Sequence, residues 1–135
     1  MEYIISLIKK IISILLGIKF KGNAPNLILN IVQELIPEGN QNRPGIHINP
    51  SKITIHNTGN NDSGTDARMH SNLVRGPIWS TPWHYTVDDT LIIKQLPLNE
   101  KAIHTGPGNS NSIGIEICMH PENNQSLANG NSGPK

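Results

Sequence analysis

The sequence has little cysteine, no excess of charge of either sign and no hydrophobic run of membrane-spanning length. Cys118 is the single cysteine among 135 residues, so no intramolecular disulfide can form. Cysteine content therefore does not decide between a reducing and an oxidising compartment. The 11 Lys and Arg residues nearly balance the 10 Asp and Glu residues, which gives a formal net charge of +1. This balance provides neither a basic stripe nor an acidic tail, so we expect no nucleic-acid partner.

The residues that are present indicate one small domain. The chain has 10 prolines, 12 glycines and 36% hydrophobic residues, a composition typical of a single domain with many loops. The glycine-rich turn at residues 104–109 has no Lys or Ser/Thr in the spacing of a phosphate-binding loop. We therefore do not expect a nucleotide site.

The longest apolar stretch covers residues 3–18. It is shorter than the roughly 20 residues that span a bilayer, and Lys9 and Lys10 interrupt it. This pattern predicts an amphipathic helix within residues 1–21, lying either on a membrane surface or against its own domain. A signal peptide fits less well, because no small-x-small cleavage site follows before Lys19. Residues 22–42 are expected to lead into the domain, with a helical or extended run at residues 27–36.

The rest of the chain is organised around residues 52–60, KITIHNTGN. Ile53 and Ile55 alternate with polar residues, which predicts a strand that sends both isoleucines to a core and carries His56 on its other face. Asn57 and the residues after it are turn formers, so His56 would lie at the mouth of the strand. Two interpretations stay open from this pattern: an exposed ligand or base, and a half-buried histidine bonded to a carbonyl.

Two further elements follow along the chain. Asp62 or Ser63 could cap a helix at residues 65–74. The runs 83–87 and 91–96 flank Asp88 and Asp89, which predicts a β-hairpin in which these carboxylates are turn residues and not a catalytic pair. The alternation in the first run predicts that His84 lies on the opposite face from Trp83 and Tyr85.

The last regular stretch, SIGIEIC at residues 112–118, again alternates. Ile113, Ile115 and Ile117 would face one way, and Gly114, Glu116 and Cys118 the other. A carboxylate in so apolar a strand is costly unless it is paired or faces a wet cleft. Glu116 is therefore the best candidate for a functional carboxylate. If this strand neighbours the strand of His56, both side chains should open into one cleft.

Four blocks of the sequence together resemble a known family. The blocks ITIHNTG, WHYTVDD, IIKQLPLNE and IHTGPGNSNSIGIEIC are similar to the zinc N-acetylmuramoyl-L-alanine amidases of the type-2 amidase and peptidoglycan-recognition family, in particular bacterial and prophage lytic enzymes (endolysins). The resemblance covers residues 43–118. It implies an α/β fold, a single domain with a central mixed β-sheet flanked by helices. It also implies a catalytic Zn²⁺ and hydrolysis of the amide between N-acetylmuramic acid and L-alanine.

The resemblance also implies roles for individual residues. His56 matches the first zinc ligand, and Glu116 matches the glutamate that accepts the proton of the attacking water. The remaining matches fall near the substrate groove, where we expect substrate-binding residues: Asn57, Thr58, Trp83, His84 and His104. Some relatives have a tyrosine where this chain has Trp83, which cannot relay a phenolic proton.

The resemblance leaves part of the family pattern without a counterpart. The family's second His and its third ligand, a Cys or Asp, belong to a later segment that we do not find in the sequence, so we expect a partial amidase domain at residues 43–120 and a disordered tail at residues 121–135. The hypotheses are an active peptidoglycan amidase, possibly completed by a separately encoded segment, and an inactive truncated amidase or peptidoglycan-binding module. Either would act at the cell wall, extracellular and possibly associated with the membrane.

Overall fold

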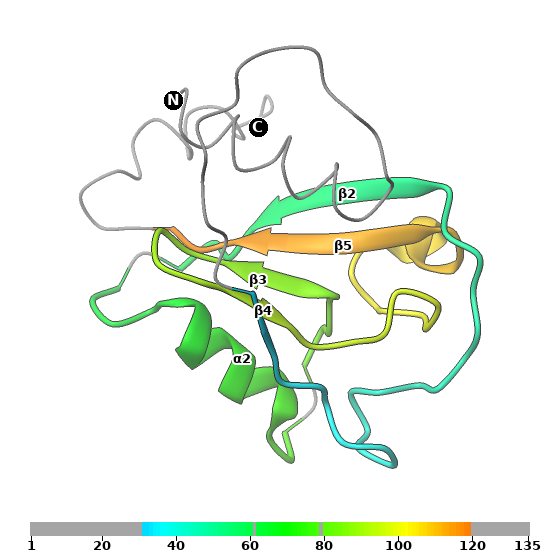
Figure 1. Ribbon diagram of the computed structural model, residues 1–135, viewed down its shortest axis with the longest axis horizontal. Helices are drawn as coiled ribbons and strands as arrows, with labels where there is room; N and C mark the ends of the chain where they lie inside the picture. Colours follow the sequence, from blue (N-terminus) through cyan, green and yellow to red (C-terminus); the bar gives the residue numbers. More distant parts are fainter. Residues whose placement is uncertain (1–30, 61, 79, 120–135) are drawn as a thin grey trace.

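The computed structural model describes residues 31–60, 62–78 and 80–119. The helix predicted within residues 1–21 and the tail predicted at residues 121–135 lie outside them. Within the described part of the chain, no helix is long and apolar enough to cross a membrane. The described residues form a mixed β-sheet with a helix on one face (Figure 1), which agrees with the predicted α/β fold.

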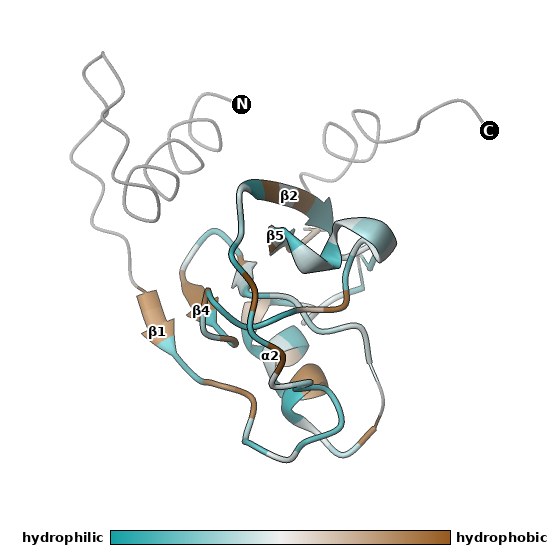
Figure 2. Cartoon of the chain, turned by 90° about the vertical axis from the view of Figure 1, so that its right-hand side faces the viewer, coloured by the Kyte–Doolittle hydropathy of each residue, from teal (hydrophilic) through white to brown (hydrophobic). Residues whose placement is uncertain are grey.

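Five strands form the sheet in the order β1-β4-β3-β5-β2. All neighbours pair in parallel except β3 and β4, which pair antiparallel. The strands are β1 (Ile31–Gln33), β2 (Lys52–Asn57), β3 (Tyr85–Val87), β4 (Ile92–Lys94) and β5 (Ser112–Ile117). β1 lies within the segment expected to lead into the domain, so that segment supplies one edge of the sheet (Figure 2).

The predicted hairpin is confirmed by the antiparallel pairing of β3 with β4. Asp88 holds the turn, because its carboxylate accepts hydrogen bonds from the backbone N–H groups of Thr90 and Leu91, each at 2.8 Å. It also accepts one from the N–H of Ala67, at the start of the helix, at 3.0 Å. The interpretation of Asp88 as a structural turn residue is therefore confirmed.

The alternation predicted for β5 is confirmed. Ile113 and Ile115 pack with Tyr85 in a buried cluster on one face of the sheet, whereas Cys118 packs with Ala67 and Ile93 on the other. The prediction for β2 is half right. Ile53 packs against the first cluster, but Ile55 is 41% exposed, because β2 is the outermost strand at its edge of the sheet.

Helix α2 (Ala67–Arg75) lies against β3 and β4 (Figure 1). Its N-cap is Asp66, whose side chain accepts a hydrogen bond from the N–H of Met69 at 2.8 Å. The prediction that Asp62 or Ser63 caps the helix is wrong, because Asp66 is the residue whose carboxylate reaches the free N–H groups of the first turn. The chain before it forms a turn in which Thr65 bonds back to Asp62.

Trp83 is not on the face that the alternation predicts. It precedes β3 and packs with Val74 of α2, Ile36 and Leu96, and its indole N–H donates to the hydroxyl of Thr86 at 2.6 Å. Thr86 shares a sheet face with His84, so Trp83 also lies on that side. Tyr85, in contrast, faces the opposite side as predicted.

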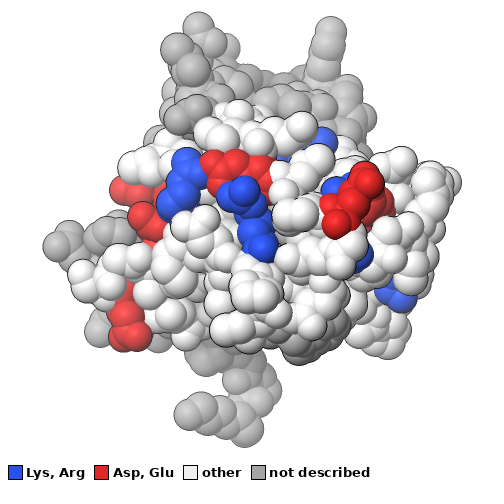
Figure 3. Space-filling view, turned by 90° about the horizontal axis from the view of Figure 1, so that it is seen from below, with Lys and Arg blue, Asp and Glu red and all other residues white. Residues whose placement is uncertain are grey.

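Ion pairs between neighbouring elements tie the edge of the sheet to the helix. Glu34, directly after β1, pairs with both Arg68 and Arg75 of α2. On the face seen from below, basic and acidic side chains lie next to one another (Figure 3).

Candidate active site

His56 and Glu116 are direct neighbours in the sheet. β2 and β5 pair in parallel, and their register places His56 opposite Glu116. Each residue is the last but one in its strand, so both lie at the carboxyl ends of two adjacent parallel strands, the edge at which open α/β sheets bind ligands. The condition set for a shared site, that the two strands are neighbours, is met.

Glu116 is a buried carboxylate that lacks a partner. The residue is 9% exposed, and its Oε2 atom has no hydrogen-bond partner among the described residues. Burial raises the pKa of Glu116 to about 7, because the charged form loses solvation that no donor replaces. Such a group can both take and release a proton near neutral pH.

The hydroxyl that stands opposite Glu116 in the sheet cannot supply the missing hydrogen bond to its carboxylate. Thr86 on β3 stands opposite Glu116. Its hydroxyl accepts from the Trp83 indole and donates to Gln95 Oε1 at 2.8 Å. A hydroxyl has one proton, so Thr86 has none left to donate to Glu116.

His104 joins the site from the segment between β4 and β5. Its Nδ1 lies 3.1 Å from Nε2 of His56, with the two rings nearly perpendicular. The ring lies over Gly114, where an added Cβ would come within 2.7 Å of its atoms. Burial, with the nearby His84 and His56, lowers the pKa of His104 to about 4. His104 is therefore neutral at physiological pH.

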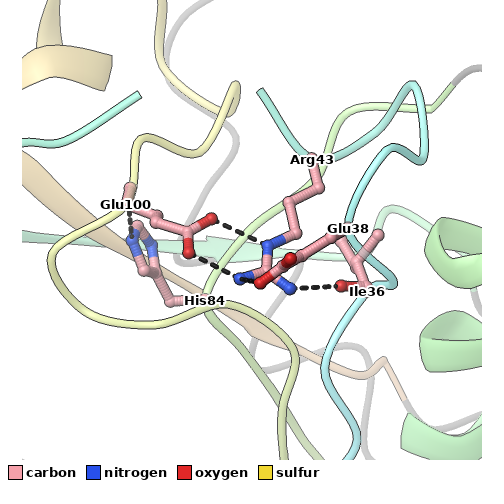
Figure 4. A network of polar contacts seen from close by, with 5 residues as sticks. All are labelled: Ile36, Glu38, Arg43, His84 and Glu100. Carbon is pink, nitrogen blue, oxygen red and sulfur yellow. Dashed lines mark hydrogen bonds and ion pairs between the residues drawn. The ribbon is translucent and has the colours of Figure 1, made fainter. Parts of the chain in front are cut away.

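His84 lies behind this pair and is fully buried. Its Nδ1 accepts from the backbone N–H of Gly114 at 3.0 Å, and its Nε2 donates to the backbone carbonyl of Glu100 at 2.9 Å. The carboxylate of Glu100 is in turn held by two hydrogen bonds from Arg43, at 2.8 and 2.6 Å (Figure 4). Burial lowers the pKa of His84, so both ring nitrogens serve the fold in the neutral form.

The other candidates divide into two groups. Asn57 and Thr58 are half-buried at the end of β2, where Asn57 accepts from the N–H of Gly59 and Thr58 from the N–H of Met119. Trp83 is 6% exposed and His84 is fully buried, so neither offers a surface to a ligand in this structure. The structure brings together His56, His104 and Glu116.

Three contributors to the site escaped the sequence analysis. Arg43 and Glu100 are 57 residues apart, and no local pattern joins them. The alternation predicts Gly114 only as a position in a strand, although its missing side chain makes room for His104. The same alternation offers a signal, because a glycine beside a candidate carboxylate in a strand often marks a close approach by another group.

Among the described residues, His56 is the candidate for binding a metal ion. His56 has one ring nitrogen bonded to His104, which leaves the other for a metal, and histidine is a usual zinc ligand. Among residues 31–60, 62–78 and 80–119 there is no group of three or more His, Cys, Asp or Glu side chains that could hold a metal ion. Catalytic zinc takes three protein ligands, so these residues alone do not complete a zinc site.

Comparison with known proteins shows the family that the chain resembles. A family described as N-acetylmuramoyl-L-alanine amidase matches residues 47–130. Two curated relatives from Bacillus subtilis (strain 168) are the N-acetylmuramoyl-L-alanine amidases XlyA, 45% identical over 109 residues, and CwlH, 42% identical over 110 residues. Each alignment covers 78% of this chain, but only 37% of XlyA and 44% of CwlH. The chain thus spans less than half the length of these relatives.

Solved structures of similar proteins share the fold of this chain. The structure of the catalytic domain of XlyA is 48% identical with a TM-score of 0.67, covering 70% of this chain and 64% of that one. The structure of PlyL is 26% identical with a TM-score of 0.58, covering 71% and 60%. The sheet and helix described above are therefore those of this kind of catalytic domain.

Proposed function

We propose a function from one established premise: the chain belongs to the N-acetylmuramoyl-L-alanine amidase family, whose pattern matches residues 47–130. The function is hydrolysis, in peptidoglycan, of the amide that joins the lactyl group of N-acetylmuramic acid to L-alanine. The observation that carries it is the buried, unpartnered carboxylate of Glu116 beside His56 at the ends of two parallel strands. The site of action would be the cell wall, outside the membrane.

Glu116 is assigned the proton transfers. Its pKa of about 7 lets the carboxylate accept a proton from the attacking water and return it to the leaving nitrogen of alanine. The unsatisfied Oε2 atom supports this role, because a carboxylate already occupied by donors would be a weaker base.

His56 is assigned to the zinc that the family resemblance implies. When bound, zinc supplies Lewis-acid polarisation of a carbonyl oxygen and of water. The described residues hold only part of a ligand set, so we assign no step of the reaction to the metal. His56 would be one ligand, and the others would come from residues outside the described part.

The remaining residues are assigned by their exposure. We assign substrate binding to Asn57 and Thr58, half-buried at the end of β2, and to the half-buried His104. Trp83 and His84 are buried, so we assign them to positioning: Trp83 directs the Thr86 hydroxyl, and His84 supports the backbone at Gly114.

One observation favours a second function. Without a full set of zinc ligands among the described residues, the same site could bind peptidoglycan without cleaving it. The two functions differ in whether new amino termini of L-alanine appear.

The test is release of peptides that begin with L-alanine from purified peptidoglycan in the presence of Zn²⁺, followed by labelling of new amino termini. We assay the chain alone, and fused to the part of the XlyA catalytic domain that lies outside the match. Release is expected, and Glu116→Gln should reduce its rate by about 10²–10⁴-fold, as expected for loss of a general base.

The matched control is Glu38→Gln, because the side chain of Glu38 is 89% exposed and lies outside the site. It should leave the rate unchanged. Binding of peptidoglycan without release, in the chain and in every well-folded fusion, would establish the binding module instead. An unaltered rate in Glu116→Gln would remove Glu116 from the mechanism.

One further assignment concerns residues outside the described part. Association of the predicted helix at residues 3–18 with a membrane surface should appear as co-sedimentation with anionic vesicles that weakens with salt. If the chain and a form lacking residues 1–21 sediment alike, that assignment fails.

A further inference from the structure

The hydroxyl of Ser112 fixes the direction of a chain of hydrogen bonds. Its Oγ lies 2.8 Å from the backbone carbonyl of Gly108 and 3.3 Å from Nε2 of His104. A carbonyl cannot donate, and a serine hydroxyl has one proton. The Ser112 proton is therefore spent on Gly108, and Oγ can only accept a proton from Nε2 of His104.

This direction continues through His104 to His56. A neutral imidazole has one N–H and one lone pair, so a proton on Nε2 of His104 leaves a lone pair on Nδ1. That atom lies 3.1 Å from Nε2 of His56. The hydrogen bond between the two rings then requires Nε2 of His56 to be the donor.

We infer that His104, oriented by Ser112, is a positioning residue that fixes the tautomer of His56, so that Nδ1 of His56 is the nitrogen presented to a metal ion. The tautomer follows from the hydrogen bonds alone, and its use for metal binding rests on the proposed function. Within the described residues the one hydrogen bond of the His56 ring is made by Nε2, which leaves Nδ1 free for this purpose. Metal-bound histidines commonly donate their other N–H to such a partner.

The packing around His104 supports the arrangement. Its ring occupies the space over Gly114 that any side chain would fill, and the ring of His84 stands nearly perpendicular to it, with centroids 6.2 Å apart. Both contacts hold the ring between Ser112 and His56. The opposite direction of bonding would need the Ser112 proton to leave Gly108, and so would lose the shorter of the two hydrogen bonds.

The test reads the protonated nitrogen of each ring directly. The full chain, with ¹⁵N-labelled histidine and free of metal, is studied by long-range ¹H–¹⁵N NMR above about pH 8, where imidazoles are neutral. Both His56 and His104 should carry their proton on Nε2. A proton on Nδ1 of His56, or a mixture of its two tautomers, would overturn the inference.

Variants separate positioning from mere packing. Ser112→Ala removes the acceptor of His104 and should convert His56 from one tautomer to a mixture, whereas Ser51→Ala, an exposed serine just before β2, should change nothing. His104→Asn, whose side-chain oxygen can take the place of Nδ1, should keep the proton of His56 on Nε2. His104→Leu should release it and weaken Zn²⁺ binding by about 10–100-fold.

An unchanged His56 tautomer in both Ser112→Ala and His104→Leu would also overturn the inference. The tautomers are read without metal or substrate, so they hold or fail independently of amide hydrolysis. If peptide release is observed while His56 carries its proton on Nδ1, the inference alone fails. If the wild-type tautomers are as expected and no release occurs, the proposed function alone fails.

Discussion

Glu100 and Glu116 are two largely buried glutamates in the same domain whose surroundings differ. Both carboxylate oxygens of Glu100 accept hydrogen bonds from Arg43, and this pairing lowers the pKa of Glu100. Glu116 has an oxygen without a partner among the described residues, and burial raises its pKa to about 7. The difference indicates which carboxylate maintains the fold and which is available for chemistry.

The physical reason is the cost of a buried charge. A carboxylate removed from water is tolerated in its charged form when donors replace the lost solvation. Arg43 replaces it at Glu100, and the backbone carbonyl of the same residue positions His84. Nothing in the described structure replaces it at Glu116, where the strand instead keeps a proton-binding group beside His56.

Removing Arg43 should have the largest effect on stability. The side chain is 10% exposed and its partner Glu100 is 18% exposed, so Arg43→Leu leaves a buried carboxylate unpaired and should lower the free energy of unfolding by about 3–5 kcal/mol. Urea denaturation measures it. Glu38→Gln removes the exposed partner of Arg43 at 3.6 Å and should cost less than about 0.5 kcal/mol. A loss below about 1 kcal/mol for Arg43→Leu would contradict the structural role.

Glu116 should make the protein less stable as pH rises, which is opposite to the effect of a carboxylate with a lowered pKa such as Glu100. Its folded pKa of about 7 exceeds the ordinary value of 4.5, so the folded form holds its proton longer than the unfolded form. The stabilisation is complete below about pH 4.5 and is lost as pH rises through about 7, a decrease of about 3 kcal/mol. Glu116→Gln should remove this decrease. Denaturation curves of both proteins at several pH values decide it, and parallel pH profiles would contradict the account.

Asp88 and Asp89 are a second pair of carboxylates whose surroundings differ, with a smaller expected effect on stability. Burial acts to raise the pKa of Asp88, but hydrogen bonds from Ala67, Thr90 and Leu91 outweigh it and lower the pKa overall. Stability from Asp88 is therefore present above its unfolded pKa and lost as pH falls through the folded one. Asp88→Ala should cost about 2 kcal/mol, whereas Asp89→Ala, at an exposed position, should cost less than about 0.5 kcal/mol. Equal losses would contradict this distinction.

Local periodicity was enough to predict most elements of the sheet. The alternation around His56 and Glu116 identified β2 and β5, and two apolar runs about Asp88 identified the hairpin. These predictions succeeded because side-chain alternation is a local property of a strand. The order of the strands was not contained in any local pattern, and the family resemblance implied only a central mixed β-sheet.

The features that the sequence did not predict correctly all depend on tertiary contacts. Asp66, not Asp62 or Ser63, caps α2 because the direction of the incoming chain decides which carboxylate reaches Met69. Trp83 lies on the α2 side because its indole reaches Thr86. The contact of His104 with His56 joins residues 48 apart, and its room depends on Gly114. None of these follows from spacing along the chain.

The central claim is that Glu116 is an unpaired carboxylate available for proton transfer, while Glu100 is a structural one. Measuring both pKa values in one sample tests it most directly. The carboxyl ¹³C shifts of labelled glutamate in the full chain are followed by NMR as a function of pH, with Glu116→Gln and Glu38→Gln for assignment. The account predicts a pKa of about 7 for Glu116 and a value below 4.5 for Glu100. A pKa at or below 4.5 for Glu116 would contradict it.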